Sequence, residues 1–179
     1  IVPTCSFTPA PPPPPLCTTY ALAFTANGGA GGEYQLDVDL SGQTGVYTIS
    51  ALVYASADYN GVEQALHTRF YTADGSNPTS TGGFPSARDE WQSVQTTVNV
   101  SSTPSSVSWY IGYPIQSTAG TMYVTNVQMT APDGMQLLDG GYFTDGANMA
   151  SYSSSASYGA YSIVPTCSFT PAPPPPPLC

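Results

Sequence analysis

The sequence has little charge, and positive charge is the scarcest. Charged residues make up 7% of the 179 residues, lysine is absent, and Arg69 and Arg88 are the only arginines. The formal net charge is -9. Because two arginines cannot build a basic patch, the sequence argues against binding to nucleic acid or to anionic membrane surfaces. No apolar run of about 18 residues is present, so we expect no membrane insertion.

The sequence also lacks the usual signals of catalysis. It has one histidine, no GxSxG motif, no CxxC motif and no phosphate-binding loop. Its neighbouring acids, such as Asp89 and Glu90, fall in expected turns or on solvent faces rather than opposed across a cleft. We therefore expect no enzyme, no bound metal and no cofactor.

One segment occurs twice without a single difference. Residues 1–17 and residues 163–179 both read IVPTCSFTPAPPPPPLC. Identical segments on both sides of a domain indicate one period of a tandem array, although an artificial duplicate would look the same. We expect linkers at 1–16 and 163–179 and one domain at 17–162, with copies of the chain itself as partners.

Five consecutive prolines dominate each copy of this segment. Proline fixes φ and favours an extended neighbour, so we expect a polyproline II rod. The seven residues 9–15 would span roughly 22 Å. Such a rod is either a spacer or a ligand for an aromatic groove, and its identical repetition favours the spacer.

The stretch TPAPPPPP resembles the hydroxyproline-rich segments of plant and algal wall glycoproteins of the extensin and pherophorin type. The resemblance implies hydroxylated prolines that carry covalent glycans, with the threonines as further attachment sites. The implied residues are Thr8, Pro9, Pro11, Pro12, Pro13, Pro14, Pro15, Thr170, Pro171, Pro173, Pro174, Pro175, Pro176 and Pro177.

The four cysteines lie only at the ends of the two proline segments. A stiff rod separates Cys5 from Cys17, whereas disulfide-bonded Cα atoms lie within about 7 Å. We therefore expect a disulfide between Cys17 and Cys167, which bracket the domain, and bonds from Cys5 and Cys179 to adjoining repeats. Disulfides imply an oxidising compartment, so we expect an extracellular protein, secreted or in a wall or surface appendage.

Alternation of apolar and polar residues dominates the central part, and no helical periodicity is convincing. We expect about eight strands, separated by turn signals such as Asp74-Gly75 and Asp133-Gly134. The expected strands cover 20–26, 33–40, 46–55, 64–72, 91–100, 106–113, 121–129 and 135–143. This pattern predicts an all-β fold, a β-sandwich or jelly roll flanked by polyproline II linkers.

The segments GVYTISALVYA and DEWQSVQTTVNV, within residues 33–129, resemble carbohydrate-binding modules of the galactose-binding-like jelly-roll superfamily. The resemblance implies a jelly roll and a structural calcium, whose acidic positions would fall at Thr144 and at Thr125 or Asn126. Neither position keeps a carboxylate, which argues against the calcium, although Asp145 and Asn126 still offer oxygens.

The superfamily usually begins with a strand that here matches QLLDGGYFTDG, at residues 136–146, after the other strands. Two interpretations follow. Residues 136–143 fold back into their own domain, or they are donated to the next module. We favour folding back because it closes a shorter loop, and we expect Leu137 and Phe143 in the core.

Sugar binding requires aromatic side chains with polar neighbours. Alternation places His67, Arg69 and Tyr71 together on an outward face, opposite Leu66 and Phe70, as a possible sugar-binding or interface set. We expect Trp91 in the core. The one N-glycosylation sequon begins at Asn99. The sequence thus predicts a structural repeat of an extracellular filament or wall glycoprotein, with a carbohydrate-binding module of a secreted enzyme or adhesin as the alternative. Further aromatic candidates for such a module are Tyr54, Tyr59, Trp109, Tyr110 and Tyr113.

Overall fold

The computed structural model describes residues 20–25, 32–36, 40, 42–61, 65–80, 82–83, 85–111, 119–139 and 160–166. In these ranges the chain is all-β, with antiparallel pairing throughout and no α-helix. The strands are β1 (Tyr20–Thr25), β2 (Gly32–Leu36), β3 (Gly45–Ala55), β4 (His67–Thr72), β5 (Trp91–Val100), β6 (Pro104–Ile111), β7 (Thr121–Thr130), β8 (Gln136–Asp139) and β9 (Ala160–Pro165).

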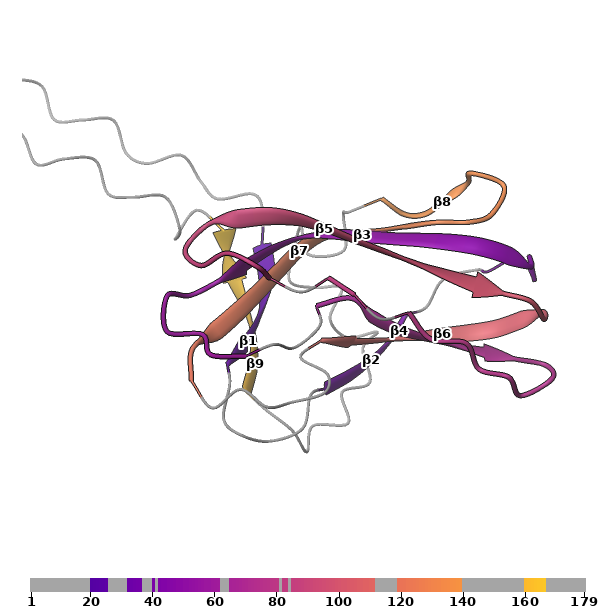
Figure 1. The fold of residues 1–179 in the computed structure, drawn as a ribbon, viewed down its shortest axis with the longest axis horizontal. Coiled ribbons are helices and arrows are strands. Elements are labelled where there is room, and N and C mark those ends of the chain that lie inside the picture. The colour runs from indigo at the N-terminus through magenta and orange to yellow at the C-terminus, as the bar shows by residue number, and fades with distance from the viewer. Residues whose placement is uncertain are drawn as a thin grey trace, which may run out of the picture.

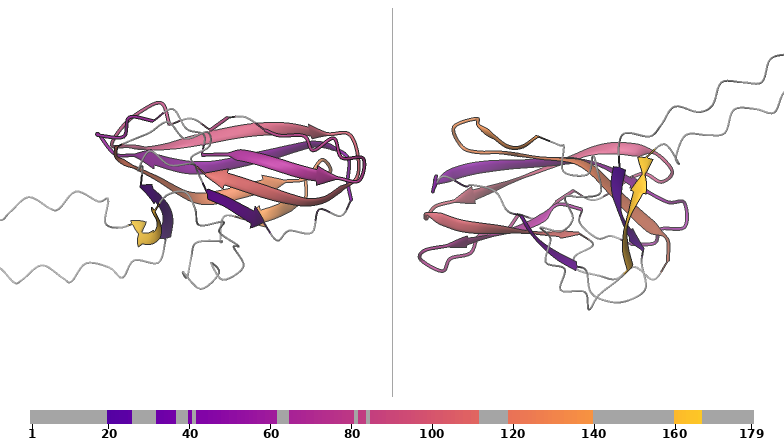
Figure 2. Two further views of the ribbon diagram at one scale, coloured as in Figure 1. Left: turned by 90° about the horizontal axis from the view of Figure 1, so that it is seen from below. Right: turned by 180° about the vertical axis from the view of Figure 1, so that it is seen from behind.

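The strands form two sheets that face each other (Figure 1). The larger sheet has the order β5-β3-β7-β1-β9, and β8 pairs with β7 beside this path. The smaller sheet has the order β2-β6-β4. Figure 2 shows from below how the strands of the two layers overlie one another, with β1 and β9 together at one end. The all-β prediction is therefore confirmed.

Strand β3 shows why these residues form this sheet. Its side chains alternate between buried and partly exposed along nearly its whole length. Tyr47, Ile49 and Val53 are fully buried, whereas Thr48 and Ser50 lie on the outer face. Since successive strand residues point to opposite faces, this alternation alone fixes which face of β3 meets the second sheet.

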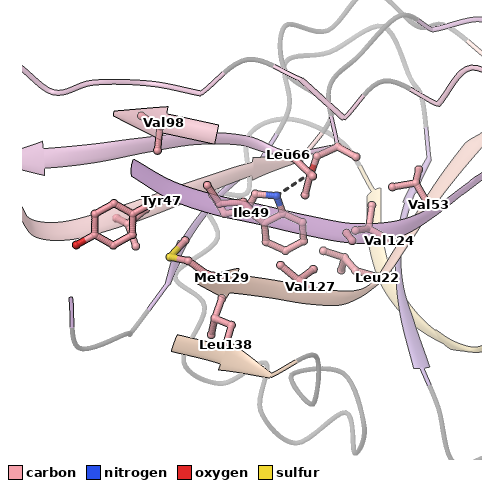
Figure 3. Close-up of a cluster of buried hydrophobic side chains, with 14 of the residues drawn as sticks. Leu22, Tyr47, Ile49, Val53, Leu66, Val98, Val124, Val127, Met129 and Leu138 are labelled. Atoms are coloured by element: carbon pink, nitrogen blue, oxygen red, sulfur yellow. Dashed lines mark hydrogen bonds between the residues drawn. The ribbon is translucent and has the colours of Figure 1, made fainter. Parts of the chain in front are cut away.

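The core lies between the sheets and joins them through aromatic side chains. Tyr47 of β3 contacts Phe70 of β4, with ring centroids 4.8 Å apart. Trp109 of β6 is 1% exposed, and its Nε1 donates a hydrogen bond of 2.7 Å to the Ala65 carbonyl. The indole therefore buries its surface without leaving its N–H unsatisfied. Figure 3 shows Leu22, Ile49, Val124, Met129 and Leu138 gathered in this core.

Strand β7 contains an irregularity that the sequence pattern only hints at. Ser50 of β3 pairs with Gln128 of β7, but Leu52 pairs with Thr125. Strand β7 therefore has one more residue than β3 between these two pairs. The extra residue allows Val124 and Val127 both to point into the core. Asn126 takes φ 52°, a left-handed conformation that asparagine tolerates better than most residues.

Strand β8 folds back onto β7 of its own chain, so the favoured interpretation agrees with the structure over residues 136–139, and residues 140–143 lie outside the described part. It forms a hairpin with β7 through the turn at Asp133-Gly134, where the Gly134 N–H donates to the Ala131 carbonyl at 3.0 Å. Leu138 is the residue that becomes buried, at 2% exposure, and Leu137 is only partly buried. Phe143 lies outside the described residues.

Strand β9 lies across the expected end of the domain. It runs from Ala160 to Pro165, so the first three residues of the second copied segment belong to the sheet. The expected boundary between residues 162 and 163 therefore falls inside a strand. Sequence patterning missed β9 because no long alternation marks it. Its position depends on pairing with β1, which is distant in sequence.

Candidate functional site

The set His67, Arg69 and Tyr71 lies on one face of β4, as alternation requires. Across the strand pair, His67 lies opposite Tyr110, and Arg69 lies opposite Ser108. The expectation that all three form an open outward surface is wrong, because His67 is only 6% exposed. Burial lowers the pKa of His67, and the positive charge of Arg69 lowers it further. Arg69 and Tyr71 are partly exposed.

The face of the smaller sheet that points away from the core is buried near His67. Ser108, on the same face, is 2% exposed. A neutral, buried imidazole is a poor ligand for a solvent-borne sugar. The geometry leaves Arg69 and Tyr71 as the accessible part of the predicted set.

A buried group of hydroxyls lies beside this strand. The Ser80 hydroxyl donates to the Leu66 carbonyl at 3.0 Å and lies 2.6 Å from Thr68 Oγ1. The Thr68 N–H donates to the Ser80 hydroxyl at 3.1 Å. These bonds attach the segment around Ser80 to β4 and satisfy buried polar atoms. The arrangement is structural, because the Ser80 hydroxyl is already committed as a donor to a backbone carbonyl.

The outer face of the larger sheet carries an aromatic row that sequence reasoning assembled only in part. Tyr54 of β3 lies between Trp91 of β5 and Tyr123 of β7, directly opposite each of them in the register. The ring centroids are 5.6 Å apart for Tyr54 and Trp91 and 5.8 Å apart for Tyr54 and Tyr123. All three side chains are partly exposed. The expectation that Trp91 is a core residue is therefore wrong.

The alternation of β5 contained a signal for this row. Trp91 shares its phase with Ser93, Gln95 and Thr97, and these three are exposed. What the sequence alone did not contain was the register, which places Trp91 opposite Tyr54. Of the other aromatic candidates, Tyr59 and Trp109 are buried, at 2% and 1% exposure. The side chain of Tyr110 and the whole of Tyr113 lie outside what the structure describes.

A tightly bonded loop, residues 85–90, borders the aromatic row. The Tyr54 hydroxyl donates to Asp89 Oδ1 at 3.0 Å, and the Asp89 N–H donates to the Ala55 carbonyl at 2.8 Å. The Gln92 side chain accepts hydrogen bonds from the N–H groups of Ser86 and Ala87, at 2.9 and 3.2 Å. These bonds hold the Asp89 carboxylate beside the Tyr54 ring.

Arg88 serves this loop as a structural clamp. Its Nε donates to the Tyr59 carbonyl at 2.8 Å, and one terminal nitrogen donates to the Pro85 carbonyl at 3.0 Å. Its guanidinium carbon also lies 5.4 Å from the centre of the Tyr59 ring, within range of a cation–π interaction. Because its donors are used by backbone carbonyls, Arg88 is not available as an anion-binding group.

Two of the positions compared with a calcium site, Thr125 and Asn126, lie in β7. The Thr125 hydroxyl donates to the Tyr20 carbonyl at 2.6 Å and so ties β7 to β1. Asn126 is the left-handed residue of the β7 irregularity. No group of three or more potential metal ligands occurs among the described residues, and Thr144 and Asp145 lie outside them.

Outside the aromatic row, the outer face of β3, β5 and β7 is uncharged and mostly polar. Asn99 is exposed there, opposite Val46, which is 52% exposed. The Asn99 side chain is accessible to a modifying enzyme, and the glycosylation of Asn99 stays a prediction. The four cysteines and the modification sites expected in the proline segments, from Thr8 to Pro15 and from Thr170 to Pro177, lie outside the described residues.

Comparisons with known proteins leave the family open. No family model matches the chain, and no match is found among curated proteins or solved structures. In the part of the chain that the structure describes, no helix is long and apolar enough to cross a membrane.

Proposed function

We propose that this chain is the structural repeat unit of an extracellular filament or wall glycoprotein. In this proposal the two sheets form a jelly-roll module, and the proline segments form glycosylated polyproline II rods between modules. The protein spaces and stiffens the filament and carries its glycans.

The observation that supports this proposal most directly is the composition of β9. Half of this strand, Ile163 to Pro165, comes from the second copy of the repeated segment, and it pairs residue by residue with β1. An artificial appendage would not be expected to complete the sheet. In this proposal the first three residues of the repeated segment belong to the folded module, and the residues after them form the connection.

The expected disulfide agrees with this arrangement. Tyr20 is paired with Pro165; Cys17 precedes Tyr20 by three residues, and Cys167 follows Pro165 by two. A bond between these cysteines would close the module where the chain enters and leaves it.

The proposal is tested by the mass of the intact natural polypeptide. We expect a chain many times longer than 179 residues whose limited proteolysis yields fragments spaced by 162 residues, each linker carrying covalent sugar. A natural chain containing only one period would refute the filament. An unmodified mass for residues 163–179, apart from their disulfides, would refute the glycosylated rod.

The aromatic row favours a second function, that of a carbohydrate-binding module. Tyr54, Trp91 and Tyr123 offer ring faces and edges to a sugar, and the carboxylate of Asp89 offers a hydrogen-bond acceptor. The rings are tilted by 53° and 70° to one another, so they do not form the flat surface on which a sugar stacks. This tilt is typical of side chains that pack against each other across strands, and sugar binding is therefore the second choice.

Tryptophan fluorescence tests this second function directly. Trp109 is buried and Trp91 is partly exposed, so a ligand on the row would change the emission of Trp91. Titration with cellohexaose should give a saturable change in Trp91 emission that Tyr123→Ala removes and Ser76→Ala, in the exposed turn after β4, retains. No change in the presence of millimolar cellohexaose, xylohexaose and chitohexaose would count against sugar binding on this face.

A further inference from the structure

The module is entered and left by the chain at the same end of two neighbouring strands. Strand β1 begins at Tyr20, strand β9 ends at Pro165, and these two residues are direct partners in the antiparallel register. Ala21 pairs with Val164, and Leu22 pairs with Ile163. Figure 1 shows β1 and β9 side by side at one end of the molecule, and Figure 2 agrees. The module's entry and exit are therefore separated by about the width of one strand pair, roughly 5 Å.

Both hydrogen-bonding edges of β1 are occupied. One edge pairs with β7 and the other with β9, and the order of the sheet ends with β9. A strand from a neighbouring module could pair with β1 only after β9 had left. The edge that remains, on β9, ends in Pro165, which is exposed and has no N–H to offer a further strand. The pairing therefore favours closure of each module within its own period.

The same pairing is expected in the preceding period of the proposed array. Ile1 to Pro3 have the same sequence as Ile163 to Pro165, the second half of β9. In an array, we expect the segment 1–3 to complete the sheet of the module before it. Only residues 4–19 would then connect one module to the next.

We infer that in the array each module lies as a side lobe beside a continuous line of connecting segments. The path of the chain along the array axis then does not pass through the module. This inference rests on the proposed repeat function. It makes the connection, rather than the dimensions of the module, the determinant of the axial period. The two sheets would lie to the side of the axis, and tension along the array would act only on the adjacent ends of β1 and β9.

The inference sets an upper limit on the period. From Pro3 to Tyr20 the chain has 17 residue steps, which cover about 60 Å at full extension. With the spacing of one strand pair, the period stays below about 65 Å for every 162 residues of chain. A path through the module, across the five-strand order of the larger sheet, would add on the order of 25 Å.

Electron microscopy of the full repeat chain tests this limit. We expect an axial period of at most about 65 Å with lobes to the side of the axis. Deleting Pro11 to Pro13 and their counterparts in every copy should shorten the period by about 9 Å, if the rod is polyproline II. The matched control is an insertion of six Gly/Ser residues at Gly75, and it should leave the period unchanged. Gly75 lies in an exposed turn, and apart from Gly75 itself and its two chain neighbours no heavy atom lies within 4 Å of the position that a Cβ would take there.

The outcomes separate this inference from the function on which it rests. A regular axial period well above 65 Å, or a period that does not change when the prolines are deleted, would overturn the side-lobe arrangement. Neither result would contradict the proposed repeat function. A chain of a single period, with no fibre, would overturn both.

Discussion

Strands β3 and β9 belong to the same sheet but depend on different interactions. Strand β3 pairs with β5 on one edge and β7 on the other, and Ile49 and Val53 on its inner face are completely buried. Among the described strands β9 pairs with β1 alone, its Ile163 and Val164 are partly buried, and Ser162 and Pro165 are exposed. The central strand is specified by its own alternation, whereas the edge strand depends on a partner distant in sequence. Stability should therefore be concentrated in β3, and β9 should need an additional constraint.

The largest expected effect concerns that constraint. Replacing both Cys17 and Cys167 by serine should lower the free energy of unfolding by about 4–5 kcal/mol, because the expected disulfide closes a loop of about 150 residues in the unfolded chain. Chemical denaturation under non-oxidising and oxidising conditions measures the loss. The pair Cys5→Ser and Cys179→Ser is the control and should change the stability of a single period little. Equal effects from the two pairs would show that the bracketing bond does not exist.

The contrast between the two strands can be measured with one type of substitution. Ile49→Ala in β3 should cost about 2–5 kcal/mol, because it removes a fully buried side chain and leaves a cavity. Ile163→Ala in β9 should cost about 1 kcal/mol or less, since the side chain already contacts solvent. Urea denaturation followed by circular dichroism measures both. A similar loss for both variants would mean that β9 is an integral part of the core.

Two glycines, Gly120 just before β7 and Gly134 after it, should also differ in how much their substitution lowers the stability of the fold. Gly120 takes φ 83°, and an added Cβ would overlap the backbone of Asp58 and Tyr59. Gly134 takes φ 88°, but nothing lies within 4 Å of its added Cβ. Gly134→Ala should therefore cost only the left-handed strain, about 1–2 kcal/mol, and Gly120→Ala should cost clearly more. Thermal unfolding of both variants decides this, and equal costs would contradict the close approach of Gly120 to Tyr59.

The smallest expected effect is a dependence on pH at the turn after β4. Asp74 Oδ1 accepts hydrogen bonds from the Ser76 N–H at 3.0 Å and the Thr72 hydroxyl at 2.8 Å, and these bonds lower the pKa of Asp74 to about 2. A lowered pKa stabilises the fold above the ordinary carboxyl value, and this contribution disappears as the pH falls from about 4 to about 2.

Comparison of the native chain with Asp74→Asn isolates this contribution. Asp133 also has a lowered pKa, through the Met135 N–H and the Gln43 side chain, and will titrate in both proteins. The difference between the two melting temperatures should shrink as the pH falls below 4. A difference that stays constant from pH 6 to pH 2 would contradict the role assigned to Asp74.

The sequence by itself determined the elements that depend on local patterns. Alternation placed Leu66 and Phe70 on the inner face, where both are fully buried, and the Asp133-Gly134 pair marked the turn between β7 and β8, since both signals lie within a few residues. The same alternation also placed His67, Arg69 and Tyr71 on one face.

Only the tertiary structure decided what that face meets and which strands are neighbours. His67 and Ser108 are buried on the outer face of the smaller sheet, and Trp91 meets Tyr54 because the β3–β5 register brings them opposite each other. Strand β9 exists because the end of the module returns to β1, more than a hundred residues away. Burial and register arise from contacts between distant segments, and a pattern that repeats every two residues carries no information about them.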